Sequence, residues 1–157
     1  RTAYEIITGK EIPFANLNVE PVRGMEGIRH ASIKIVGTLP QWKFLEGVEL
    51  KVAVAHGLIN ARIIMDQIAA GESPYHFIEV MACPGGCIGG GGQPIPTNEE
   101  IRKARAAAIY EEDMNMPLRK SHDNPEIKKI YAEFLKEPLS HVSHNLLHTH
   151  YTRRKPY

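Results

Sequence analysis

The sequence predicts an α/β fold in which a βαβ unit with parallel strands is followed by a helical C-terminal region. Three observations support this prediction. Leu50, Val52 and Val54 repeat with period 2, a helical apolar spacing follows over residues 61–69, and a second strand-like run occupies residues 76–81. Strand, helix and strand within about thirty residues form a βαβ unit, which requires a crossover connection and a parallel strand pair.

An earlier strand is expected over residues 31–36, where Ile33 and Ile35 alternate with polar neighbours. The strand at residues 50–54 is expected to end at Gly57, and the following helix at Gly71 and Pro74. The apolar face of that helix consists of Ala61, Ile64, Met65, Ile68 and Ala69.

Three helices are expected after the α/β part. Thr97 and Glu100 form a capping-box pattern for a helix over residues 98–115. Asp123 or Asn124 caps the next helix, and Ser140 caps a last one near residues 140–151. The second helix has Pro125 in its first turn and the apolar stripe Ile127, Ile130, Tyr131, Phe134 and Leu135. We therefore expect an α/β part over residues 1–96 and a helical part over residues 97–157.

Composition narrows the class of protein. With 157 residues and 43% hydrophobic content, the chain has the size and core of a single domain. The 19 basic and 18 acidic side chains nearly cancel, so no strong field indicates a nucleic-acid or membrane-surface partner. We expect no membrane span and no signal segment, and thus a cytoplasmic location, with a processed periplasmic form left open.

A glycine-rich loop follows the strand at residues 76–81. Residues 81–94 hold both cysteines of the chain, Cys83 and Cys87, and six of its 13 glycines. Two thiols at this spacing can face one soft-metal site, and glycines let backbone N–H groups approach cluster sulfur. A disulfide, a redox couple and a zinc site are the alternatives. The short loop argues against a disulfide, and the Cys-x-x-x-Cys spacing argues against a redox couple. No second cysteine pair is present for zinc, but the eight histidines keep a zinc site open, and two buried thiols without a role are a further alternative.

The loop resembles the third signature motif of the iron-only (FeFe) hydrogenases. The motif covers residues 77–87, FIEVMACPGGC, and continues through residues 90–94, GGGQP. Weaker similarity to the same family extends over residues 4–35 and 54–57. Beyond residue 101, the segments RAAAIY, SHDNP and LLHTHY are similar to the family's small-subunit region.

The resemblance implies a reversible conversion of protons and electrons to H₂ at an H-cluster, a 4Fe-4S cluster linked to a diiron subsite with CO, CN and dithiolate ligands. Cys83 would be a terminal ligand of the 4Fe-4S cluster, and Cys87 would bridge it to the diiron subsite. The resemblance also implies that Met81 lies against the diiron subsite. The remaining predicted cofactor-binding residues are Gly85, Gly86, Gly91 and Gln93, with loop amides from Gly85 to Gly91 available to cluster sulfides.

The chain departs from the family in lacking its first two signature motifs. A cubane cluster needs four thiolates and two are present. We therefore expect an incomplete half of the catalytic domain, beginning at Arg1, that works with a chain or segment carrying the remaining cysteines. Ferredoxin or a nicotinamide-linked subunit and hydrogenase maturation proteins are the other implied partners. An iron–sulfur assembly protein or a sensory hydrogenase is the alternative function.

Glu79 and the histidines are further candidates for the site. Strand alternation puts Glu79 and Met81 on one face, where a buried Glu79 would need a partner and is a structural or weak relay candidate. His56 is expected to be a satisfied core histidine or one that supports the site. His141, His144 and His148 share a helical face, but packing explains them better than zinc binding, because the metalloprotease glutamate is missing.

Overall fold

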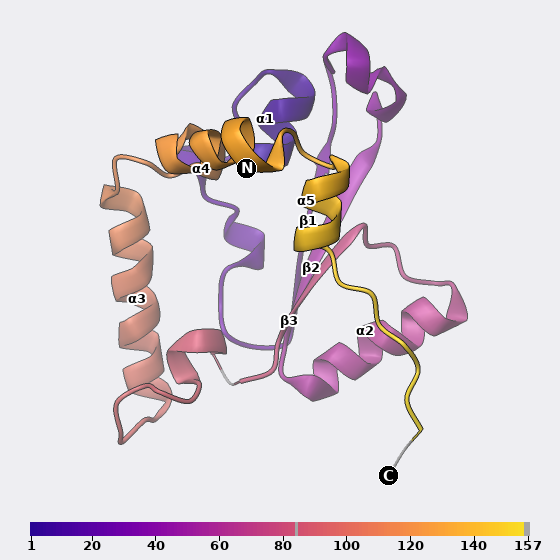
Figure 1. Cartoon of the computed structure of the whole chain (residues 1–157). Coiled ribbons are helices and arrows are strands. Elements are labelled where there is room, and N and C mark those ends of the chain that lie inside the picture. The colour runs from indigo at the N-terminus through magenta and orange to yellow at the C-terminus, as the bar shows by residue number, and fades with distance from the viewer. Residues whose placement is uncertain (84, 156–157) are drawn as a thin grey trace. The chain divides into compact units, whose positions relative to one another are not determined.

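The computed structural model describes residues 1–83 and 85–155, which form two compact units (Figure 1). One comprises Arg1 and Ala3–Asn115, and the other Thr2 and Met116–Tyr157. The first unit contains helix α1 (Thr2–Thr8) apart from its first residue, the sheet, helix α2 and helix α3. Pro84, a member of the predicted motif, lies outside the described residues.

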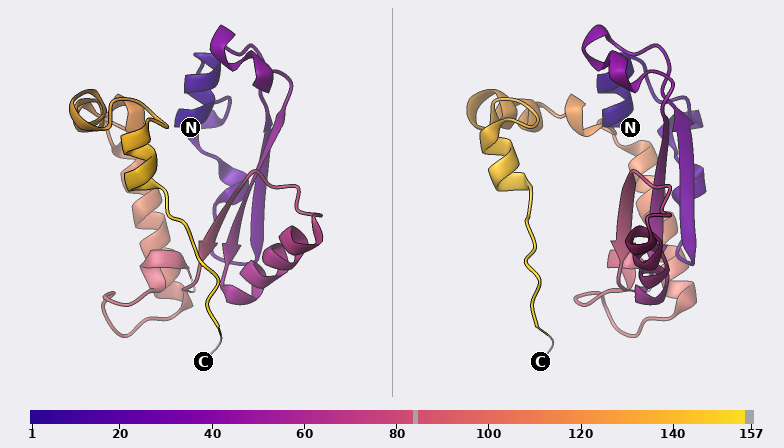
Figure 2. Two further views of the ribbon diagram at one scale, coloured as in Figure 1. Left: turned by 45° about the vertical axis from the view of Figure 1, so that its right-hand side comes forward. Right: turned by 90° about the vertical axis from the view of Figure 1, so that its right-hand side faces the viewer.

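The sheet of the first unit has the order β1-β2-β3 (Figure 2). Strand β1 (Ile28–Lys34) runs antiparallel to β2 (Glu49–His56), with Ser32 opposite Lys51. Strand β3 (Phe77–Met81) runs parallel to β2, with His56 opposite Met81. The predicted βαβ unit is therefore confirmed, whereas β1 begins and ends earlier than the expected 31–36.

Helix α2 (Leu58–Ala70) makes the crossover between the parallel strands. Gly57 precedes it, and Gly71 ends it in the left-handed conformation with φ 75°, donating its N–H to the carbonyls of Gln67 and Ile68. The core between helix and sheet is small and consists of the buried residues Ala53, Ala55, Ala61 and Ile64, packed against Ile28, Tyr75 and Ile78. Small alanines in the central strand bring helix and sheet close together.

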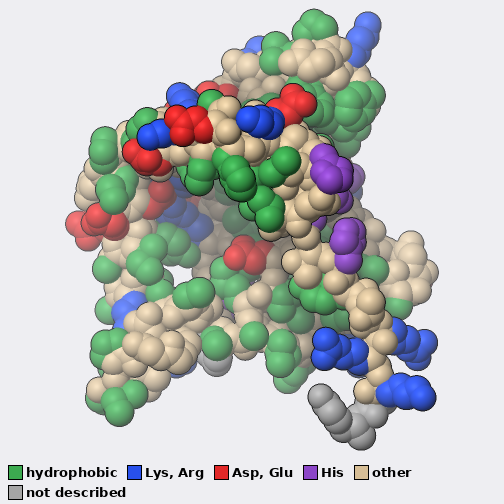
Figure 3. Space-filling model, in the orientation of Figure 1, with side chains coloured by type: hydrophobic (Ala, Val, Ile, Leu, Met, Phe, Trp, Pro, Cys, Tyr) green, Lys and Arg blue, Asp and Glu red, His purple; other side chains and the backbone are tan. Residues whose placement is uncertain are grey.

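Part of the predicted apolar face of α2 does not reach this core. Ala61 and Ile64 are buried as expected, but Met65 is 63% exposed and Ile68 is 52% exposed. Phe77 and Val80 on β3 are also exposed. Many hydrophobic side chains are open on the face drawn in Figure 3. Several side chains of the predicted apolar faces are therefore not buried by other parts of this chain.

Helix α3 (Glu99–Asn115) begins one residue later than the capping-box pattern predicts. The side-chain oxygen of Asn98 accepts the N–H of Ile101 at 2.8 Å, so Asn98, and not Thr97, caps the helix. The capping-box spacing of Thr97 and Glu100 does not decide the cap, because Asn98 offers a side-chain acceptor one residue later. No residue of α3 is buried.

The second unit is built from short helices. Asn124 caps α4 (Pro125–Ile130) by accepting the N–H of Glu126, and a π-helical turn, Tyr131–Leu135, continues it. Ser140 caps α5 (His141–Leu147), which is shorter than the expected 140–151. The apolar stripe predicted for this region is mostly exposed. Leu135 is the one member of the stripe that is buried.

Candidate metal centre

The cysteine loop leaves the sheet at the carboxyl end of β3. The carbonyl of Met81, the last residue of that strand, accepts the N–H of Gly57 at 2.7 Å, which ties the end of β3 to the turn between β2 and α2. Cys83 follows two residues later, and Cys87 lies in the 3₁₀ turn Gly86–Gly89. The carboxyl ends of parallel strands are where open α/β sheets bind ligands.

Both thiols are free and exposed. They line one cavity of about 380 Å³ together with Met81, Gly86, Gly90 and Gly91. The structure therefore gathers most of the predicted site residues at one point. Gly85 lines a neighbouring cavity of about 200 Å³, which also contacts Met81 and Cys87.

Two glycines leave room for sulfur in this loop. Gly86 has φ 70°, and a Cβ built on it would lie 2.6 Å from Sδ of Met81, closer than real contacts allow. A Cβ on Gly90 would lie 3.4 Å from Sγ of Cys83, in the space beside the thiol. The loop is thus a cradle whose wall includes Cys83 and Cys87. Two thiols in this position suit a soft metal group.

Hydrogen bonds inside the loop hold the cysteine backbone. The N–H of Gly86 donates to the carbonyl of Cys83 at 2.8 Å. The carbonyl of Cys87 accepts from the Gly90 N–H at 3.4 Å and from Nε2 of Gln93 at 3.1 Å. Gln93 therefore acts on the loop through its side chain, while the amides of Gly86 and Gly90 are engaged by the backbone.

The surroundings of Glu79 and His56 differ in part from those expected from the sequence. Glu79 is exposed at the rim of the cavity, so it needs no buried partner. His56 is buried, as expected of a core histidine, but neither ring nitrogen has a hydrogen-bond partner among the described residues. The expectation that its ring is satisfied is therefore wrong, and a supporting role at the site stays a prediction. Burial lowers the pKa of His56, and the nearby Arg29 charge lowers it further, while the Glu79 charge acts in the opposite direction.

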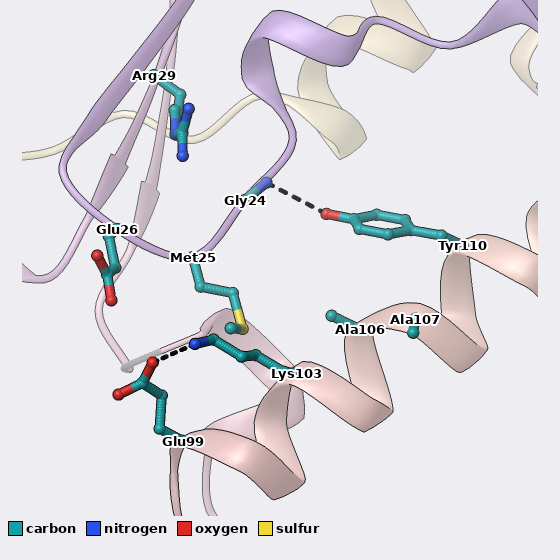
Figure 4. Close-up of a pocket in the computed structure, with 9 residues that line it drawn as sticks. All are labelled: Gly24, Met25, Glu26, Arg29, Glu99, Lys103, Ala106, Ala107 and Tyr110. Atoms are coloured by element: carbon teal, nitrogen blue, oxygen red, sulfur yellow. Dashed lines mark hydrogen bonds and ion pairs between the residues drawn. The ribbon is translucent and has the colours of Figure 1, made fainter.

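A third cavity, of about 530 Å³, lies between the segment 24–29 and α3 (Figure 4). The hydroxyl of Tyr110 accepts the N–H of Gly24 at 3.4 Å on one side, and Lys103 pairs with Glu99 at 2.5 Å on the other. None of the sequence motifs predicts this cavity. No spacing pattern reveals it, because its two walls are distant in sequence.

The described residues do not provide a complete metal site. Across residues 1–83 and 85–155, no three His, Cys, Asp or Glu side chains gather where they could hold a metal ion. His148 lies just beyond the end of α5 in extended conformation, so the three histidines do not share a helical face as expected. The rings of His144 and His148 have centroids 4.4 Å apart. The two cysteines would therefore need ligands from elsewhere to hold a cluster.

Comparison with known proteins agrees with the cysteine motif. Residues 1–91 match the family model of the iron-only hydrogenase large subunit, C-terminal domain, and residues 99–154 match that of the iron hydrogenase small subunit. Within the described part of the chain, no helix is long and apolar enough to cross a bilayer.

The NADP-reducing hydrogenase subunit HndD of Solidesulfovibrio fructosivorans is 49% identical over 156 residues, 99% of this chain and 24% of that protein. A probable cytosolic Fe-S cluster assembly factor of Drosophila mojavensis is 40% identical over 105 residues, 66% of this chain and 22% of that protein.

The structure of an FeFe-hydrogenase from Chlamydomonas reinhardtii superposes with a TM-score of 0.75 at 42% identity, over 96% of this chain and 42% of that one. The chain thus spans about a quarter of the curated relatives it matches and under half of this structure. These matches run through both units, and the chain belongs to the iron-only hydrogenase family.

Proposed function

We propose that this chain supplies Cys83 and Cys87 to the H-cluster of an iron-only hydrogenase that reversibly reduces protons to H₂. The observation that carries the proposal is the shared cavity of the two free thiols beyond the carboxyl end of β3. Family membership gives the reaction class, an oxidoreduction. When bound, the cluster would supply the two-electron chemistry, 2H⁺ + 2e⁻ ⇌ H₂.

The residues of the loop fit this group. Cys83 would be a terminal ligand of the 4Fe-4S part and Cys87 its bridge to the diiron subsite, both as thiolates. The glycine cradle, including Gly85, Gly86 and Gly91, keeps Cβ atoms away from the cluster, and Gln93 fixes the Cys87 carbonyl at 3.1 Å. Met81, whose sulfur lies against Gly86, would contact the diiron subsite.

The missing ligands would come from a further segment or chain. The third strand is an edge of the sheet among the described residues, and Phe77 and Val80 on it are exposed. A strand edge with apolar side chains is a surface that other polypeptide readily covers. We place the α/β part at residues 1–96 and the small-subunit-like part at residues 97–157, because the two family models meet between residues 91 and 99.

Electrons would come from ferredoxin or a nicotinamide-linked subunit, and hydrogenase maturation proteins would insert the diiron subsite. The name of the similar NADP-reducing hydrogenase subunit favours the nicotinamide-linked route. We place this chemistry in the cytoplasm, where a nicotinamide couple is available.

An iron–sulfur assembly function, or a sensory one, is the second candidate. The assembly factor matches 66% of the chain, whereas the hydrogenase subunit matches 99% of it and the small-subunit model covers residues 99–154. The extended match favours the enzyme. Hydrogen turnover by the complete protein distinguishes the two, because an assembly factor would bind clusters and evolve no H₂.

The first test compares the chain alone with the chain joined to the segment that carries the remaining ligands. Alone, it should hold no stable four-iron cluster and evolve no H₂ from reduced viologen, since two thiolates are half of a cubane's ligands. The complete protein should hold the four-iron cluster and evolve H₂. Turnover by the isolated chain supplied with the diiron cofactor would contradict the proposal.

The second test is Cys87→Ser in the complete protein, because serine is a poor soft-metal ligand. The diiron subsite should be lost, and with it the carbonyl and cyanide infrared bands and all turnover. Ala104→Ser, which places the same hydroxyl on an exposed part of α3, is the control. Normal bands and activity in Cys87→Ser would show that Cys87 is not the bridge.

A further inference from the structure

Arg105 joins helix α3 to the cysteine loop. Its guanidinium donates from one nitrogen to the carbonyl of Ile88 at 2.9 Å and from another to the carbonyl of Pro94 at 2.9 Å. The first of these nitrogens also lies 3.5 Å from the hydroxyl of Thr97. Ile88 directly follows Cys87 in the sequence, and Pro94 ends the glycine-rich segment. One side chain therefore holds both ends of residues 88–94.

The helix that carries Arg105 is itself held at two further points. Tyr110 accepts the Gly24 N–H, and the guanidinium of Arg23 lies 4.3 Å from the centroid of its ring. One turn further, Asp113 pairs with Arg1 at 3.0 Å and with Arg23 at 3.4 Å. Arg105 thus donates from a helix whose position is set by contacts away from the loop.

From this geometry we infer that Arg105 is a positioning residue for the cluster loop: it sets the path of residues 88–94 and, through the Ile88 carbonyl, the position of Cys87. The loop has little else to define it, because its glycines leave the backbone free. Its internal bonds are the contacts of Gly90 and Gln93 with the Cys87 carbonyl and one from the Gln93 N–H to Gly90. Arg105 binds the segment from outside.

The inference deepens the proposed function, on which its effect at the cluster rests. It also assigns a role to the small-subunit region, since Arg105 lies within residues 99–154 and the cysteines within residues 1–91. A planar guanidinium suits the task because its donors point in fixed, separate directions. A lysine carries the same charge at a single point and cannot reproduce the fork.

The experiment compares Arg105→Lys and Arg105→Met in the complete protein with the unsubstituted protein. Arg62→Lys, the same change at an exposed arginine of α2 that pairs with Asp66, is the matched control. Amide hydrogen exchange in peptides covering residues 85–94 reports the loop. The reduction potential of the four-iron cluster and the carbonyl band positions report the cluster, and thermal unfolding reports the fold.

We expect exchange in residues 85–94 to quicken about tenfold in Arg105→Met, since charge-assisted hydrogen bonds of this kind are lost, and less in Arg105→Lys. The potential and the bands should shift in the same order. Thermal unfolding should show that both Arg105 variants remain folded, and Arg62→Lys should match the unsubstituted protein. Unaltered exchange in both Arg105 variants would overturn the inference. So would faster exchange with an unmoved potential and bands, because Arg105 would then hold the loop without positioning the cluster.

Failure of the proposed function gives a different result. If the unsubstituted complete protein holds no cluster, the proposed function is overturned. The part of this inference that concerns the position of the cluster is overturned with it. Hydrogen exchange would still decide whether Arg105 holds the loop, because that measurement needs no metal.

Discussion

The two helices that flank the sheet region are held by opposite means. Helix α2 packs by burial, with Ala61 and Ile64 against the alanines of β2. Helix α3 has no buried residue and is held by polar side chains, through Arg105, Tyr110 and Asp113. Tyr110 meets a partner 86 residues away in sequence, and Asp113 meets partners 90 and 112 residues away. Arg105 meets the loop before the helix, where Ile88 lies 17 residues away.

This difference separates scaffold from site. Apolar burial is insensitive to direction and makes the βαβ unit robust, whereas hydrogen bonds are directional and can fix the path of a loop that has little side-chain bulk. The cysteine loop lies between the two helices in the sequence and depends on both. Its start is tied to the turn before α2, and its end to α3.

The largest expected effect is on the apolar side of the comparison. Ile64 is 1% exposed, and Ile64→Ala removes buried methylenes and leaves a cavity, which should lower the free energy of unfolding by about 2–5 kcal/mol. Urea denaturation of variant and unsubstituted protein measures it. Ile59→Ala, at an 83% exposed position of the same helix, is the control, and equal losses in both would refute a core role for Ile64.

The next effect concerns the polar anchors. Asp113→Asn keeps the size of the side chain but removes the charge that pairs with Arg1 and Arg23, so the free energy of unfolding should fall by about 1–2 kcal/mol. Asp66→Asn, which breaks a highly exposed pair with Arg62, should cost less than about 0.5 kcal/mol. Similar losses in the two variants would mean that α3 is not held at Asp113.

Met81→Leu tests the strand end with a smaller effect on stability. The swap roughly conserves volume and should cost under about 1.5 kcal/mol. If the thioether faces the diiron subsite, carbonyl stretching frequencies should shift and turnover should fall, because a polarizable sulfur is lost. Met65→Leu on the exposed face of α2 is the control. Unshifted bands would place Met81 in ordinary packing.

The smallest effect is a pH dependence from His56. Its pKa is lowered in the folded chain by burial and by Arg29, so the unfolded chain takes up the proton first as pH falls. Stability should therefore decline below about pH 6.5 and level off below the folded pKa. His56→Leu should remove this part of the decline in urea denaturation at stepped pH. An unchanged profile would show that His56 contributes none of it.

Much of the scaffold was predictable from local pattern. The period-2 and period-3.6 spacings predicted β2, α2 and β3, and they predicted the parallel pair correctly because only a crossover joins strands through a helix of that length. The same spacing overstated burial at Met65 and Ile68, since periodicity identifies an apolar face but not what covers it. The capping-box motif predicted Thr97 as the cap of α3. The cap is instead its neighbour Asn98, whose side chain accepts the Ile101 N–H.

By itself, the sequence determined the βαβ unit, the family and the two cysteines of the candidate site, because strand and helix periods and motif spacings are local properties of the chain. Only the tertiary structure decided that Met81 lies against Gly86, that both thiols open into one cavity, and that Arg105 holds the loop. These contacts depend on where the backbone of one segment meets a side chain from another. That meeting is set by packing and by directional hydrogen bonds, which no spacing along the chain encodes.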